Sequence, residues 1–173
     1  MSAALKAEYR LHAFAFNQVQ WDWCCELGKR RRLAKHNEGR KMKDESFIAH
    51  QYGVMGEYAA SVVYDARMNT SISPNGDRHR GDIILPDGRE VEVKLSNYTG
   101  RNVHLKFTEN ELPHMQHACL VQMFLEERRC LVYPIYSKDR FLKHVRNENY
   151  GNGPCNIVNC GDWKQHFGVA YHE

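Results

Sequence analysis

Three observations predict an α/β domain in which a mixed central sheet is flanked by helices. Of the 173 residues, 42% are hydrophobic and 26% are charged, which is the composition of a globular domain. Apolar residues recur at spacings of three to four between residues 47 and 63, as in an amphipathic helix. Several later segments alternate apolar and polar residues, which is typical of half-buried strands.

The N-terminal part is expected to be a helical, basic arm over residues 1–45, followed by a core over residues 46–173. Residues 1–36 are rich in apolar residues and read as mostly helical, and Trp21 and Trp23 are expected to anchor this arm on the core. A polar connector follows at 37–45. The core then begins with a helix from about residue 46 to 65 that carries Glu57.

A β-hairpin is the strongest local prediction. Leu85-Pro86-Asp87-Gly88-Arg89 has Pro to preset φ and Gly for a left-handed residue, as a three-residue hairpin loop requires. If Leu85 pairs with Arg89, Ile83 faces Val91 and Asp82 faces Glu92. The strands are expected at 81–85 and 89–96.

The second hairpin strand has two different faces. Val91, Val93 and Leu95 share one face, whereas Glu92 and Lys94 share the other, beside Asp82. Directly opposed carboxylates destabilise a hairpin, and a divalent cation would convert that repulsion into coordination. The alternative is an ordinary half-buried strand with a solvated polar face.

These residues resemble the PD-(D/E)XK nuclease superfamily, which has the restriction-endonuclease-like fold. Asp82 in Gly81-Asp82 is followed by Glu92-Val93-Lys94 as the E-x-K element, and Gly56-Glu57 upstream matches the Gly-Glu of the first core helix. The resemblance covers roughly residues 46–136. One departure is Gly81, where the namesake motif has Pro.

The resemblance implies a role for each matching residue. Asp82 and Glu92 would bind Mg²⁺ or Mn²⁺ with the Val93 carbonyl, and Glu57 would join directly or through water. Lys94 would orient or help deprotonate the attacking water and stabilise charge on the phosphate. Taken alone, without the other motif residues, Glu57 is expected to be a solvated helix residue.

Basic residues are concentrated in two places. Residues 29–43 hold eight Lys or Arg and one acid, and further basic residues immediately precede Asp82. They are candidates for contacts with the nucleic-acid backbone, and the alternative is a solvated basic surface. His104 and Lys106, on the polar face of a predicted strand, either line a phosphate-binding cleft or face water. The candidate nucleic-acid contacts are Lys29, Arg30, Arg31, Arg32, Arg40, Lys41, Lys43, Arg78, His79 and Arg80.

The remaining elements alternate along the second half of the chain. Thr108 and Glu111 form a candidate capping box. A helix is expected from Ser137 to about residue 144 or 146, and residues 147–161 are expected to be a loop. Strands are expected at 67–73, 103–107, 118–125 and 130–136.

The predicted function is metal-dependent hydrolysis of phosphodiester bonds in DNA, with endonucleolytic cleavage favoured. A homodimer would suit paired cuts. The chain has neither a secretory leader nor an apolar run that could cross a membrane, and its six cysteines are expected to be free thiols, so an intracellular protein, cytoplasmic or nucleoid-associated, is expected. The alternatives are a non-catalytic nucleic-acid-binding protein on the same fold and a protein-interaction domain.

Overall fold

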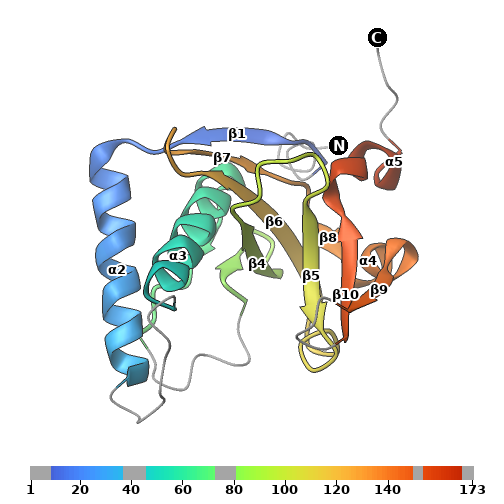
Figure 1. Cartoon of the computed structure of the whole chain (residues 1–173), viewed down its shortest axis with the longest axis horizontal. Coiled ribbons are helices and arrows are strands. Elements are labelled where there is room, and N and C mark those ends of the chain that lie inside the picture. Colours follow the sequence, from blue (N-terminus) through green and yellow to red (C-terminus); the bar gives the residue numbers. More distant parts are fainter. Residues whose placement is uncertain (1–8, 37–45, 73–80, 150–153, 169–173) are drawn as a thin grey trace.

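The chain folds into two sheets with helices on both sides (Figure 1). The computed structural model describes residues 9–36, 46–72, 81–149 and 154–168, and only the backbone of residues 35, 36 and 46–50. The predicted α/β class with a mixed central sheet is confirmed.

The large sheet has seven strands in the order β1-β7-β6-β4-β3-β2, with β8 beside the start of β6. Strands β4 and β6 run parallel, and the other described pairs are antiparallel. The strands are β1 (His12–Ala15), β2 (Arg67–Met68), β3 (Ile83–Ile84), β4 (Glu90–Ser96), β6 (His117–Phe124), β7 (Arg129–Val132) and β8 (Tyr136–Ser137).

The small sheet has the order β5-β10-β9, with β5 (His104–Thr108), β10 (Pro154–Asn159) and β9 (Arg146–Asn149). The prediction of a loop over residues 147–161 is therefore wrong. Its Gly, Asn and Pro content suggested a loop, but the described part alternates buried Cys155 and Ile157 with half-buried Asn156 and pairs with distant β5. Pairing with a distant partner is invisible in local composition.

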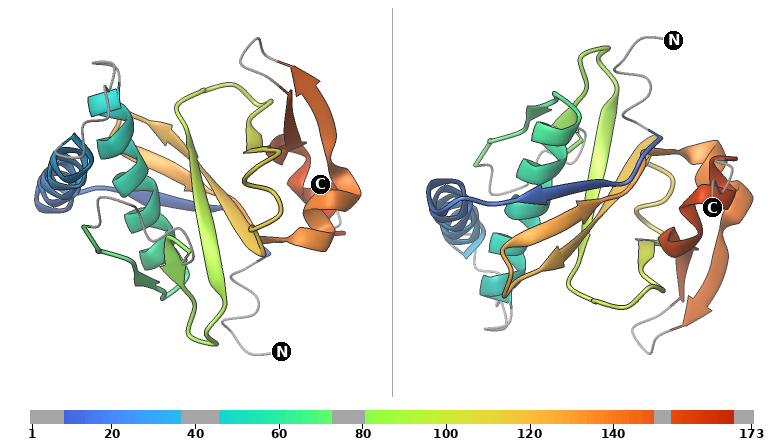
Figure 2. Two further views of the ribbon diagram at one scale, coloured as in Figure 1. Left: turned by 90° about the horizontal axis from the view of Figure 1, so that it is seen from below. Right: turned by 90° about the horizontal axis from the view of Figure 1, so that it is seen from above.

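Two apolar cores lie on opposite faces of the large sheet, beneath the elements that Figures 1 and 2 show on either side of it. Helix α3 (Ser46–Val63) packs on one face, and α2 (Gln18–His36) packs against α3. The small sheet lies on the other side together with α4 (Lys138–His144), the 3₁₀ turn η1 (Cys160–Asp162) and α5 (Trp163–His166). Strand β6 contributes Cys119 and Val121 to the first core and Ala118 and Leu120 to the second, so it is buried on both faces.

The N-terminal segment differs from the helical prediction in one respect. Residues 12–15 form strand β1, which pairs antiparallel with β7 at the edge of the large sheet. The helix then runs from Gln18. Trp21 packs against the first core as predicted, whereas Trp23 is 43% exposed, with its ring centroid 5.5 Å from that of Tyr58. The alternating burial of His12–Ala15 was obscured because apolar residues are dense throughout this segment.

Two chain-wide expectations can also be compared with the structure. All six cysteines have free thiols, as predicted. In the described residues, none of the helices combines the length and apolar character needed to span a bilayer.

Candidate active site

The hairpin that begins the site forms as predicted. Ile83 pairs with Val91, the Leu85 N–H donates to the Arg89 carbonyl over 2.9 Å, and the Gly88 N–H donates back to the Leu85 carbonyl. Gly88 has φ +88°, a conformation that a residue with a Cβ rarely adopts. The loop therefore fixes the register that brings Asp82 alongside β4.

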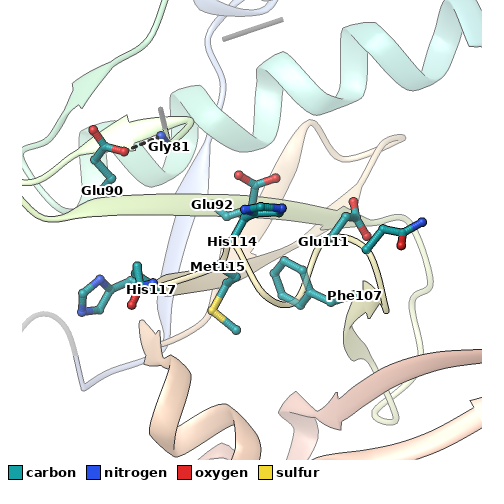
Figure 3. Close-up of a pocket in the computed structure, with 10 residues that line it drawn as sticks. Gly81, Glu90, Glu92, Phe107, Glu111, His114, Met115 and His117 are labelled. Carbon is teal, nitrogen blue, oxygen red and sulfur yellow. Dashed lines mark hydrogen bonds between the residues drawn. The ribbon is translucent and has the colours of Figure 1, made fainter. Parts of the chain in front are cut away.

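The two faces of β4 separate as the alternation predicts. Val91 is fully buried in the first core, and Val93 and Leu95 pack against it. Glu92 and Lys94 lie on the opposite face, and Figure 3 shows Glu92 extending from this strand. The motif thus combines an apolar face that packs on the core with a polar face that carries Glu92 and Lys94.

Asp82 lies where β3 and β4 stop pairing. The described ladder between them ends at Ile83 and Val91, and beyond it the Val93 N–H donates to Asp82 Oδ2 over 2.7 Å. The Asp82 carbonyl accepts from the Asn69 N–H over 2.9 Å, which ties the same residue to the chain beyond β2. A side chain therefore replaces the ladder at this point and holds the Asp82 carboxylate against β4.

Glu57 approaches from α3 and is buried, with 8% of its surface exposed. The alternative of a solvated helix residue is therefore wrong. Arg31 on α2 donates from Nη1 to both carboxylate oxygens, over 2.9 and 2.7 Å, and its Nη2 donates to the Asn69 carbonyl. One arginine thus joins α2, α3 and the segment after β2.

A close helix contact places Arg31 over Glu57. Gly28 lies one turn before Arg31, and a Cβ built on it would lie 2.7 Å from the Gln51 Cα of α3. Any larger residue would force the two helices apart, since the obstructing atom is backbone. The glycine therefore permits the approach that lets a guanidinium reach a carboxylate on the neighbouring helix.

The carboxylates destabilise one another's charged forms. Burial and the charge of Asp82 raise the pKa of Glu57 to about 8, although Arg31 lowers it. Burial and the charge of Glu92 raise the pKa of Asp82 above its ordinary value, against the lowering by the Val93 N–H and Lys94. The charges of these acidic groups thus affect one another's pKa values, and acidic residues with such perturbed pKa values are enriched at functional sites.

Lys94 is held between two acids on the other face of β4. Its Nζ donates to Glu92 Oε1 over 3.2 Å and to Glu111 Oε1 over 2.9 Å, and it lies 4.9 Å from the centre of the Phe107 ring. Burial would lower the pKa of Lys94, but Glu92 and Glu111 raise it above its ordinary value. Lys94 is therefore a cation at neutral pH in this arrangement.

Glu111 is a member of this group that sequence reasoning placed in a capping box. The box does form, because Glu111 Oε2 accepts from the Thr108 N–H and hydroxyl while Thr108 Oγ1 accepts from the Glu111 N–H. The segment that follows forms turns instead of a helix. The second oxygen of Glu111 is left for Lys94, and no local signal could have revealed that contact.

An open pocket of about 550 Å³ is lined by Glu92 and Glu111, both of which accept a hydrogen bond from Lys94. Figure 3 shows Glu92, Glu111 and His114 grouped in it, with Phe107 and Met115 below them. The pocket is large enough to admit part of a polymeric substrate beside the polar face of β4. Its lining residues are Gly81, Glu90, Glu92, Phe107, Asn110, Glu111, His114, Met115, Gln116 and His117.

The donor set suits a hard divalent cation. Asp82, Glu92 and Glu57 offer carboxylate oxygens, which Mg²⁺ and Mn²⁺ prefer, and a cation would offset the burial and the mutual repulsion that raise the pKa of Glu57 and Asp82. In the arrangement described, Arg31 takes both oxygens of Glu57 and the Val93 N–H takes one of Asp82. Among the described residues, no three His, Cys, Asp or Glu side chains converge closely enough to hold an ion.

The predicted nucleic-acid contacts fall into three groups. Lys29 and Arg30 are exposed on α2, and Lys29 lies 4.0 Å from Glu26. Arg32 is half-buried on the same helix, whereas Arg31 forms an ion pair with Glu57. The other predicted contacts lie outside the described residues, namely Arg40, Lys41, Lys43, Arg78, His79 and Arg80.

Comparison of the chain with protein-family models, with curated proteins and with solved structures gives no match. The functional argument therefore rests on the geometry of the site.

Proposed function

We propose that this chain is a nuclease of the PD-(D/E)XK type that hydrolyses phosphodiester bonds in DNA with Mg²⁺ or Mn²⁺. The observation that carries the proposal is the grouping of Glu57, Asp82 and Glu92 beside Lys94 where two strands part. The carboxylates come from α3, from the residue before β3 and from β4, and bringing like charges close together is unfavourable unless a cation or a proton compensates them.

The bound ion would acidify a water molecule and offset charge that develops on the phosphate. Asp82 and Glu92 would hold it, with the Val93 carbonyl as a further ligand. Glu57 would act through water, because Arg31 occupies both of its oxygens. Lys94, protonated and fixed by Glu92 and Glu111, would orient the attacking water and stabilise negative charge on the phosphate, so the alternative role of proton acceptor is the less favoured one.

DNA is the proposed substrate because α2 presents Lys29 and Arg30 on its exposed surface, and basic side chains supply most backbone contacts. Internal cleavage is proposed because the chain shows no second motif for recognising an end. A homodimer and an intracellular location, cytoplasmic or nucleoid-associated, are parts of the same proposal. The rival is a binding module on this fold. Nucleic-acid binding alone does not explain why three carboxylates are grouped here.

The test is cleavage of supercoiled plasmid and of linear duplex in Mg²⁺, Mn²⁺ or EDTA. The wild type is compared with Asp82→Asn and Lys94→Ala, and with Arg129→Ala as the control for loss of a basic side chain, because Arg129 lies on β7, pairs with Glu127 and is not among the residues that line the pocket beside β4. We expect metal-dependent nicking of the plasmid by the wild type and the control, and none by the two site variants.

Two other outcomes are informative. Binding that is salt-sensitive and indifferent to metal, without cleavage, would favour the binding-module rival. Neither cleavage nor binding would favour a protein-interaction domain.

A further inference from the structure

A second cluster of polar side chains lies in the small sheet, apart from the carboxylate site. It surrounds an open pocket of about 420 Å³. The small sheet, α4 and α5 that build it lie together on one side of the molecule in Figure 1. Its lining residues are Asn102, His104, His144, Arg146, Asn159, Asp162 and His166.

The three strands of the small sheet direct their residues to one face. His104 on β5 is paired with Asn159 on β10, and Arg146 on β9 is paired with Ile157, two residues before Asn159. Paired residues share a face, as do residues two apart along a strand. His104, Asn159 and Arg146 therefore lie on the same side of the sheet by register alone.

Two helix ends close this face with histidines. His144 ends α4 and His166 ends α5, and their rings stack with centroids 4.1 Å apart. His166 Nδ1 is 2.9 Å from the hydroxyl of Tyr136, which is fully buried, so this contact fixes the orientation of the ring. Asp162 accepts from Asn159 Nδ2 over 2.9 Å, so its carboxylate is already engaged within the wall.

The local field favours an anion. Burial and Arg146 lower the pKa of His104, with a further lowering by Lys106 and an opposing effect from Glu148. Burial, Lys143 and Arg140 lower the pKa of His144.

The pKa of His166 is lowered as well. Burial and His144 lower it, and the negative charge of Asp162 opposes them. The positive charge that disfavours an imidazolium is also the charge that attracts an anion.

We propose that this pocket binds a phosphate group, held by the Arg146 guanidinium and by the His104 and His144 rings on one face of the small sheet. Arginine matches a phosphate through paired N–H donors, and the imidazoles and the Asn102 amide add donors around it. The phosphate belongs either to a nucleic-acid backbone or to a free phosphate or nucleotide, since the recognition chemistry is the same. The inference is independent of the proposed nuclease activity.

The test is a titration of the full chain with inorganic phosphate in EDTA, against chloride at equal ionic strength, at about pH 6 and about pH 8, on either side of the ordinary histidine pKa. The imidazole signals are followed by NMR. Phosphate should shift those of His104 and His144. Sulfate, which is a dianion at both pH values, is titrated alongside and should bind more tightly at the lower pH, because an anion favours the protonated rings.

Arg146→Met is the site variant, and Arg129→Met on β7 of the large sheet is the control. Arg146 is exposed, so its replacement should leave the fold intact. We expect Arg146→Met to weaken phosphate binding about tenfold, from the loss of a charge-assisted hydrogen bond, and the control to bind as the wild type does. Binding that is equal in all three proteins, or no shift of the histidine signals, would overturn the proposal.

A labelled single-stranded oligonucleotide then identifies the source of the phosphate. If its binding weakens in Arg146→Met and inorganic phosphate competes with it, the pocket receives a nucleic-acid backbone. If inorganic phosphate depends on Arg146 but the oligonucleotide does not, the pocket receives a free phosphate or nucleotide. Either result supports the site.

Discussion

Replacing Arg31 with Met should destabilise the protein more than replacing the exposed basic residues Lys29 and Arg30 of the same helix. Methionine keeps most of the apolar stem but removes the guanidinium that donates to both oxygens of Glu57 and to the Asn69 carbonyl. The side chains of Arg31 and Glu57 are 19% and 11% exposed, so solvent cannot take over these bonds. The change therefore leaves a buried carboxylate without its partner.

The size of the effect follows from this burial. Breaking a buried ion pair from one side costs about 3–5 kcal/mol. Glu57 can avoid part of this cost by taking a proton, because its pKa is already raised to about 8. We therefore expect a loss of about 3 kcal/mol in the free energy of unfolding, the lower end of that range, and a fall in Tm of roughly 6–12 °C for a chain of this length.

Urea unfolding of Arg31→Met, Glu57→Gln and the double variant measures the loss and the coupling between the two side chains. We expect the double variant to lose at least about 1 kcal/mol less than the sum of the single variants, because the two side chains form one network. Lys29→Met is the matched control, since Lys29 is exposed on the same helix and should change stability by less than about 0.5 kcal/mol. If Arg31→Met is as stable as this control, the argument about the buried pair is refuted.

Two further predictions concern stability. In EDTA, the free energy of unfolding should fall as pH rises from about 5 towards 8, by about 1.4 kcal/mol per pH unit for each carboxyl that titrates. The sign follows because the folded state raises the pKa of Glu57 and Asp82, so their contribution is complete below the unfolded pKa and is lost as pH passes the folded pKa. Saturating Mg²⁺ should flatten this slope, and an equal slope with and without Mg²⁺ in urea unfolding would contradict it. Gly28→Ala should destabilise the protein by about 1–3 kcal/mol because its Cβ meets the Gln51 backbone, whereas Gly53→Ala in α3 meets nothing within 4 Å and should stabilise it by up to about 1 kcal/mol. Thermal unfolding of the two alanine variants checks this, and equal effects would be inconsistent with a close helix contact.

Local chemistry explains why the hairpin could be predicted so closely. Pro86 and Gly88 determine the loop, the loop determines the register, and the alternation along β4 then separates Glu92 and Lys94 from the apolar face. Each step depends on residues that are near in sequence. The region from Asp82 to Lys94 therefore needed no tertiary information.

The rest of the site depends on contacts between distant residues. The pair of Arg31 with Glu57 spans 26 positions, and that of Lys94 with Glu111 spans 17. In the sequence, Arg31 is one residue of a basic tract. Only the packing of α2 on α3 shows that it pairs with a carboxylate. The pairing of β10 with β5 was hidden for the same reason, since long-range partners leave no local pattern.

The proposed function requires Glu57, Asp82 and Glu92 to hold a divalent cation, and a Mn²⁺ titration measures this directly. Mn²⁺ is titrated into the wild type and Asp82→Asn at neutral pH, and free Mn²⁺ is followed by electron paramagnetic resonance. We expect saturable binding by the wild type that competes with Mg²⁺. Asp82→Asn should weaken this binding at least about tenfold, because a charged ligand is replaced by a neutral one. No saturable binding by the wild type, or binding of equal strength in Asp82→Asn, would contradict the claim.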